Sequence, residues 1–105
     1  MEPPHRARNA EFERRERDSY VFLRHVYTLA GGRPGASLSG DQVAAQLAFD
    51  TSEALGLINY LVAGGLLLRG DRGKIVLTAR GTEYIEHLAR RRNSVRLMAP
   101  GGREA

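Results

Sequence analysis

The apolar residues in the first third of the chain fall on one face of a helix. The segment 11–18 that precedes this face mixes acidic and basic residues at helix-compatible spacing, and Phe12 is its only large apolar residue. We predict one helix over about residues 10–30, which the glycine- and proline-rich segment 31–35 ends. The residues of this face recur in steps of three and four, which is the period of an amphipathic helix. They are Tyr20, Leu23, Val26, Tyr27 and Ala30.

Two shorter helices should follow, each opened by a residue that can cap it. Ser39 begins an S-x-x-Q capping box in which the Gln42 side chain reaches back to the N-cap, and this predicts a helix over 40–47. Asp50 offers a second such start. The helix that it opens should run over 51–63 and stop at the glycine pair behind it. Its inward residues should be Ala54, Leu57, Ile58, Leu61 and Val62.

The last part of the domain has the pattern of a hairpin followed by a helix. Two apolar segments, 66–69 and 74–78, flank a turn with the sequence Gly-Asp-Arg-Gly, which predicts a β-hairpin. Thr78 can cap a final helix over about 79–92. The predicted fold class is therefore mainly α with a small β-hairpin (α+β), in the order helix, helix, helix, hairpin, helix. The inward residues of the last helix should include Tyr84, Ile85 and Leu88.

The two ends of the chain lack this patterning. We expect a flexible arm over 1–9, one domain over 10–92 and a flexible tail over 93–105. The composition, with 42% hydrophobic and 27% charged residues, is that of a globular protein. No signal-peptide pattern is present, and the longest uncharged run, 54–68, is shorter than the roughly 20 residues of a membrane span. We therefore expect a cytoplasmic protein that has no membrane partner.

The net charge of +4 is unevenly distributed along the chain. Residues 1–36 carry +2, residues 37–68 carry −3 without any Lys or Arg, and residues 69–105 carry +5. Basic ends on either side of an acidic middle suit a nucleic-acid partner. All basic residues except one are arginines, which favour bidentate contacts to phosphate or carboxylate. A GC-rich genome explains the same arginine bias equally well.

Four segments, in this order and spacing, resemble the winged helix-turn-helix family. The resemblance covers about residues 18–92 and implies a winged-helix fold, DNA binding and transcriptional control, commonly as a dimer. It also implies that the third helix enters the major groove and that the wing contacts the flanking backbone or minor groove. Some members of the family bind only proteins, so the fold does not decide the function. The segments are Ser-Gly-Asp-Gln-Val-Ala-Ala-Gln-Leu at 39–47 (second helix), 50–61 (recognition helix), Leu-Val-Ala-Gly-Gly-Leu-Leu at 61–67 (entry to the wing) and Leu-Thr-Ala-Arg-Gly-Thr-Glu-Tyr-Ile at 77–85 (entry to the closing helix).

The resemblance assigns candidate DNA contacts to the third helix and the wing. Asn59 could read an adenine edge, Ser52 a base or a phosphate, and Tyr60 a phosphate. The basic wing suits phosphate or minor-groove contact, although charged hairpin edges also serve to prevent strand aggregation. The candidate contacts are Thr51, Ser52, Asn59 and Tyr60 from the helix, and Arg69, Arg72, Lys74 and Arg80 from the wing and the helix after it.

One feature of the third helix favours a different partner. Neither this helix nor the one before it contains Lys or Arg, and Glu53 would lie near phosphates. The strip opposite the predicted core consists of small residues, which allow close approach of a protein helix as well as of DNA, with Leu55 and Tyr60 at its rim. The alternative is therefore a winged-helix protein–protein interaction module that docks through residues 50–63 without nucleic acid. The strip consists of Ser52, Gly56, Asn59 and Ala63.

The sequence gives no support to an enzyme. There is no cysteine, and His5, His25 and His87 are too far apart for a local metal-binding pattern. Phosphate-binding glycine loops and catalytic triads in a supporting context are also missing. We expect no catalytic residues, no metal and no cofactor. The expected partners are double-stranded DNA, a possible protein partner, and a second copy of the chain bound through the terminal helices, around 12–27 and 79–92.

Overall fold

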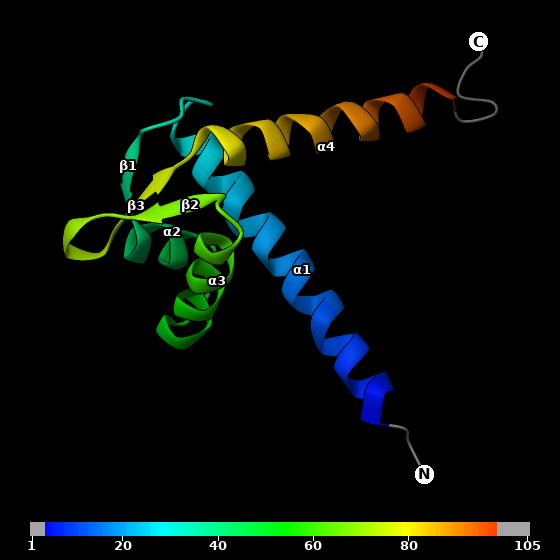
Figure 1. The fold of residues 1–105 in the computed structure, drawn as a ribbon, viewed down its shortest axis with the longest axis horizontal. Helices are drawn as coiled ribbons and strands as arrows, with labels where there is room; N and C mark the ends of the chain where they lie inside the picture. The colour runs from blue at the N-terminus through cyan, green and yellow to red at the C-terminus, as the bar shows by residue number, and fades with distance from the viewer. Residues whose placement is uncertain (1–3, 99–105) are drawn as a thin grey trace.

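The computed structural model describes the backbone of residues 4–98 and the side-chain surroundings of residues 10–91. The fold is mainly helical with a small three-stranded antiparallel sheet, so the predicted α+β class is confirmed. A single 3-10 turn, Asp71–Gly73, joins the last two strands. The elements in chain order are α1 (Pro4–Leu29), β1 (Ser37–Ser39), α2 (Gly40–Gln46), α3 (Thr51–Ala63), β2 (Leu67–Arg69), β3 (Lys74–Leu77) and α4 (Ala79–Met98) (Figure 1).

Side chains cap the two middle helices where the sequence predicts. Ser39 Oγ accepts a hydrogen bond from the Gln42 backbone N–H at 3.2 Å. Asp50 forms a complete capping box, because its carboxylate accepts from the Glu53 N–H at 2.8 Å and its own N–H donates to the Glu53 carboxylate at 3.0 Å. These bonds satisfy backbone donors that have no partner within the helix. The predicted starts of α2 and α3 are confirmed, but the predicted return bond from the Gln42 side chain to the Ser39 backbone does not form, so only α3 has a complete capping box.

The sheet contains one strand more than the predicted hairpin. β3 lies in the middle, with β2 on one side and β1 on the other, both antiparallel to it. Ser37 pairs with Val76 and Ser39 with Lys74. β1 is not predictable from the sequence, because three residues are too few to show an alternating pattern and because its partner strand lies far along the chain.

The core lies between the second half of α1, the inner faces of α2 and α3, the sheet and the start of α4. Phe22 is fully buried, although it is not among the residues of the predicted face of α1. The centroid of its ring lies 6.4 Å from the centroid of the Phe49 ring. Tyr84 was predicted to face inward but is 38% exposed, because it lies at the rim of a cavity between α1, α3 and α4. The buried apolar residues are Phe22, Leu23, Val26, Ala30, Val43, Ala44, Ala54, Leu57, Ile58, Leu61, Leu67, Ile75, Leu77 and Ile85.

Two glycines lie where neighbouring elements approach closely, and only at Gly81 is the space too small for any side chain. A Cβ on Gly40, at the start of α2, would lie 3.2 Å from both the Gly73 carbonyl oxygen and Ile58 Cδ1. A Cβ on Gly81, in the first turn of α4, would lie 2.3 Å from the carbonyl oxygen of Leu66. The Thr78 hydroxyl caps α4 as predicted, since it accepts from the Gly81 N–H at 2.9 Å.

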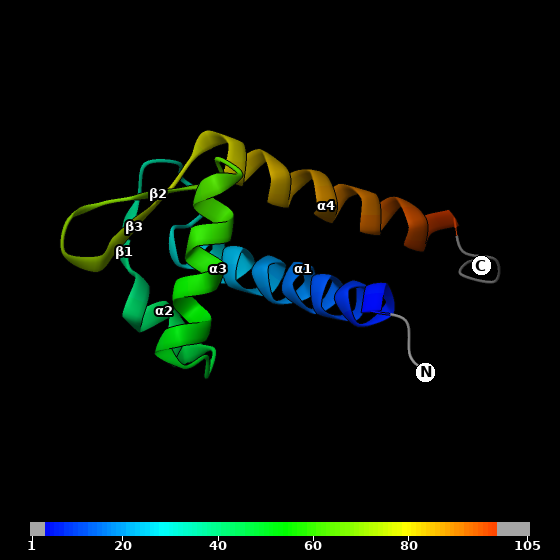
Figure 2. The same cartoon turned by 60° about the horizontal axis from the view of Figure 1, so that its bottom comes forward.

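Both long helices extend beyond the core on the same side of the domain (Figures 1 and 2). Near the core the Tyr27 hydroxyl of α1 donates to the Glu86 carboxylate of α4 at 3.0 Å, and outward from there the helices diverge (Figure 1). They also differ from the predicted bounds, because residues 4–9 of the expected arm and 93–98 of the expected tail are helical. Each segment continues a helix that is anchored in the core and therefore adds residues without a new nucleation step. The rest of the expected arm and tail lies outside the described residues.

Candidate nucleic-acid interface

The inner face of α3 is buried and its opposite face is exposed. Ala54, Leu57, Ile58 and Leu61 point into the core, as the predicted rotation of the helix requires, although Val62 is only half-buried. The side chains of Thr51, Ser52 and Asn59 are exposed. Leu55 lies beside them with 52% of its surface exposed. The outer surface of α3 therefore presents hydroxyl and amide groups together with one large apolar side chain, and it bears no cation of its own.

Tyr60 is turned toward α1 rather than toward this outer surface. Its hydroxyl donates a hydrogen bond to the Glu16 carboxylate of α1, and its side chain is half-buried. A helix turns by about 100° per residue, so Tyr60 points well away from Asn59, its neighbour in sequence. A phosphate at Tyr60 would have to compete with a carboxylate that already accepts the hydrogen bond of the phenol O–H. The structure therefore does not bring Tyr60 together with Ser52 and Asn59.

The three basic residues of the hairpin are exposed, but they do not form a single patch. Arg69 pairs with Ile75, so it lies on the face of the sheet that packs against the core. Lys74 begins β3 and lies on the opposite face, because successive residues of a strand alternate. Arg72 lies between the strands, in the left-handed region at φ 56°. The tip also carries the exposed carboxylate of Asp71.

Arg80 lies at the other end of the hairpin. Its Cδ would be 3.5 Å from a Cβ on Gly65, which places the Arg80 side chain over the turn between α3 and β2. The same turn is bound by Thr78, whose hydroxyl lies 2.8 Å from the Gly65 carbonyl oxygen and 3.0 Å from that of Leu66. Thr51 and Ser52 are in the first turn of α3, whereas Arg80 is next to its last turn. The predicted contacts are thus spread along the whole of α3.

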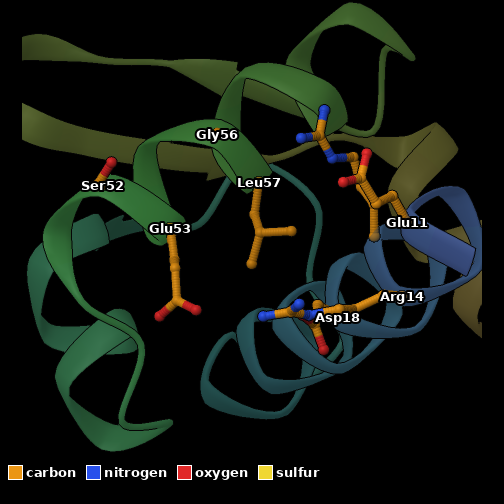
Figure 3. Close-up of a pocket in the computed structure, with 8 residues that line it drawn as sticks. Glu11, Arg14, Asp18, Ser52, Glu53, Gly56 and Leu57 are labelled. Atoms are coloured by element: carbon orange, nitrogen blue, oxygen red, sulfur yellow. The ribbon is translucent and has the colours of Figure 1, made fainter. Parts of the chain in front are cut away.

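α1 runs beside the first half of α3, and the two helices form a groove that the sequence does not predict. This cavity of about 330 Å³ brings Arg14 and Arg15 of α1 next to Ser52 and Gly56 of α3. Glu53 and Leu57 project from α3 toward the segment of α1 that bears Arg14 and Asp18 (Figure 3). The two arginines supply cations beside a helix that has none. Glu11, Asp18 and Glu53 line the same groove, so its net charge is slightly negative.

No signal in the sequence could have located this groove. The mixed charges of 11–18 indicate an exposed helix, and only the crossing of α1 over α3 shows which of these residues approach Ser52. Comparison with known proteins gives no further assignment: no family model, no curated protein and no solved structure matches this chain. Within the described residues no helix combines the length and the apolar character needed to cross a membrane.

Proposed function

We propose that this chain is a winged helix-turn-helix module that binds double-stranded DNA and acts as a transcriptional regulator. The observation that best supports this proposal is that the polar outer face of α3 is exposed and that a protruding basic hairpin, β2–β3, follows α3 in the chain. Both are parts of one domain, in which α2 and α3 are joined by a short connection and the hairpin extends beside them (Figure 1). In winged-helix proteins these are the elements that contact the major groove and the flanking backbone.

The two elements have different tasks in this proposal. Ser52 and Asn59 reach base edges, since hydroxyl and amide groups donate and accept in the major groove. Thr51, in the first turn of α3, positions the helix on a phosphate. Arg69, Arg72 and Lys74 contact phosphates, and Arg80 extends this contact past the end of α3. Tyr60 is left out of the interface because its hydroxyl is bonded to α1.

The distribution of charged side chains indicates which element supplies the affinity for DNA. The groove between α1 and α3 holds two arginines against three carboxylates, so it adds little net attraction for phosphate. The hairpin and the start of α4 hold four cations against Asp71. Each phosphate that the protein neutralises releases counterions, and binding is then weakened by salt. The proposal therefore requires salt-sensitive binding that depends on the hairpin.

The experiment is fluorescence anisotropy with a mixed-sequence duplex, titrated at several salt concentrations. The variant is Arg72→Glu with Lys74→Glu. The matched control is Arg24→Glu with Arg33→Glu, which changes the net charge by the same amount at exposed positions outside the hairpin. We expect salt-sensitive binding by the natural protein and by the control, and at least tenfold weaker binding by the hairpin variant. Absence of binding at low salt, or equal losses in the two variants, would contradict the proposal.

The second candidate function is protein binding through α3, and the exposure of Leu55 on a face without cations favours it. This face is better suited to an apolar protein surface than to phosphate. A partner held by α3 should be lost when Leu55→Glu is introduced, and its binding should depend little on salt. Retention of a captured partner by the Leu55→Glu variant would eliminate this candidate.

We further propose a homodimer that uses the projecting helices. Phe12 lies on the outer half of α1 with 60% of its surface exposed, and the described part of the domain offers it little cover. Sedimentation velocity should show a dimer that Phe12→Ser shifts toward monomer. A natural protein that sediments as a monomer at high concentration would contradict this. The proposed regulator is cytoplasmic and uses no cofactor.

A further inference from the structure

A second cavity lies on the other side of α1, where α1 meets the end of α3 and the start of α4. Its volume is about 400 Å³, which is within the range of small-molecule sites. Tyrosines from three different helices line it, Tyr20 of α1, Tyr60 of α3 and Tyr84 of α4. We call this cavity the tyrosine pocket. Three of the four tyrosines of the chain are thus gathered around one space.

The only charged side chain among the described residues that line the tyrosine pocket is Glu16. Its carboxylate accepts the hydrogen bond from Tyr60, and its backbone carbonyl accepts one from Ser19 Oγ at 2.9 Å. Ser19 is buried, so the turn of α1 that bears Glu16 is fixed against the domain. Among the described residues no Arg or Lys side chain lines the pocket. The pocket therefore combines electron-rich aromatic rings with a fixed negative charge.

This combination is selective for positive charge on an apolar body. The face of a tyrosine ring attracts a cation, and quaternary ammonium groups are bound by several such rings together. A carboxylate in a half-buried site adds attraction for the same charge and repels anions. The remaining lining is apolar, as at Leu61 and Leu66, and would cover the uncharged part of a ligand.

We propose that the tyrosine pocket binds a monovalent organic cation that carries an aromatic or branched-alkyl group. The cation lies among the rings of Tyr20, Tyr60 and Tyr84 beside Glu16, and the apolar group rests on Leu66. Binding of this ligand does not require DNA. Cation binding in the tyrosine pocket is therefore independent of the DNA-binding function proposed above.

The test uses phenyltrimethylammonium as the probe and tert-butylbenzene as its uncharged counterpart of the same shape. Isothermal titration calorimetry on the full chain measures both affinities. Tyrosine fluorescence gives a second readout, because the chain has no tryptophan and three of its four tyrosines line the pocket. We expect saturable binding of the cation in the micromolar to low-millimolar range, at least tenfold tighter than binding of tert-butylbenzene.

Two pairs of variants locate the site. Glu16→Gln keeps an acceptor for Tyr60 but removes the charge, and should weaken cation binding roughly tenfold. Glu13→Gln removes the same charge from an exposed position of α1 outside the pocket and should leave binding unchanged. Tyr84→Leu, at the exposed rim, should weaken binding about fivefold. Tyr27→Phe alters the one tyrosine outside the pocket and should have no effect.

Several results would overturn the proposal. These are equal affinity for the charged and the uncharged probe, equal effects of Glu16→Gln and Glu13→Gln, and no saturation at millimolar cation. Circular dichroism checks that each variant is folded, and Tyr84→Leu tests the site independently if Glu16→Gln is not. The pocket could instead be covered by a second copy of the chain. Cation affinity that falls as sedimentation shows increasing dimer would identify that occupant and overturn the proposal.

Discussion

α3 and the β2–β3 hairpin lie side by side but are stabilised in different ways. α3 is capped by Asp50 and buries a complete inner face, so its position is fixed while its outer face contributes nothing to the core. The hairpin buries Leu67, Ile75 and Leu77 near its base, whereas its tip is exposed and is closed by the backbone bond from the Gly70 N–H to the Lys74 carbonyl at 2.8 Å. Positive charge is concentrated on the less packed element. A surface of this kind would take its affinity from the hairpin and its selectivity from the helix.

The largest loss of stability should come from a change at the start of α4, where Gly81 packs against Leu66 in the turn between α3 and β2. We call this contact the joint. Gly81→Ala would place a Cβ 2.3 Å from the Leu66 carbonyl oxygen, between α3 and β2. Because that oxygen belongs to the backbone, the chain itself must move, and we expect a loss of about 3 kcal/mol in the free energy of unfolding. Urea denaturation followed by circular dichroism measures it.

Gly56→Ala is the matched control for this substitution. No atom lies within 4 Å of a Cβ at Gly56, on the outside of α3. Alanine is preferred to glycine inside a helix, so this variant should be more stable by about 0.5–1 kcal/mol. Opposite signs for the two glycines would confirm the packing at the joint, and similar losses would show that α4 does not press on the turn as described.

The next effect separates the two faces of the hairpin. Arg69 lies on the face of the sheet toward the core and α3, whereas Lys74 lies on the other face. If one duplex contacts α3 and the hairpin together, Arg69→Ala should weaken DNA binding about tenfold, and Lys74→Ala by about threefold or less. Salt titration of the affinity checks whether each loss also lowers the salt slope by about one. A greater loss for Lys74→Ala would place the duplex on the outer face of the sheet.

A smaller effect distinguishes the cap of α3 from its outer face. Asp50→Ala removes the side-chain acceptor of the Glu53 N–H and should lower the free energy of unfolding by about 1 kcal/mol. Leu55→Glu changes a residue that is 52% exposed and should change the free energy of unfolding by less than about 0.5 kcal/mol. Chemical denaturation of both variants measures the difference. If Leu55→Glu were the more damaging of the two, the outer face of α3 would contribute to the fold.

The smallest effect concerns pH and lies outside the proposed interface. The hydrogen bond to Glu86, followed by burial, raises the pKa of Tyr27 above its ordinary value. A raised pKa in the folded state means that the protonated phenol stabilises the fold fully below the ordinary pKa of about 10, and that this stability is lost as the pH rises through the higher value. Tyr27→Phe should remove this alkaline loss. Absorbance at 295 nm, compared between the natural protein and Tyr27→Phe, should show that the tyrosine lost in the variant ionises above the ordinary pKa, and ionisation of that tyrosine at the ordinary pKa would contradict this.

The sequence could predict those features of the fold that depend on neighbouring residues. The caps at Ser39 and Asp50, the hairpin and the inner face of α3 all follow from local spacing. β1 could not be predicted, because a three-residue strand is defined by its pairing with β3. For the same reason, the sequence could identify the exposed residues of α3 but not the position of α1 beside them. The approach of Arg14 to Ser52, the bond between Tyr60 and Glu16 and the gathering of three tyrosines depend on how α1 crosses the domain.

The contact at Gly40 has a mechanical consequence. Only a hydrogen atom separates the start of α2 from the Gly73 carbonyl at the hairpin tip and from the side chain of Ile58 on α3. A side chain at Gly40 would require the hairpin tip or Ile58 to shift by a few tenths of an ångström. Gly40 therefore lies at the point where α2, α3 and the hairpin tip meet, and the distance between α3 and the tip depends on the small size of this one residue.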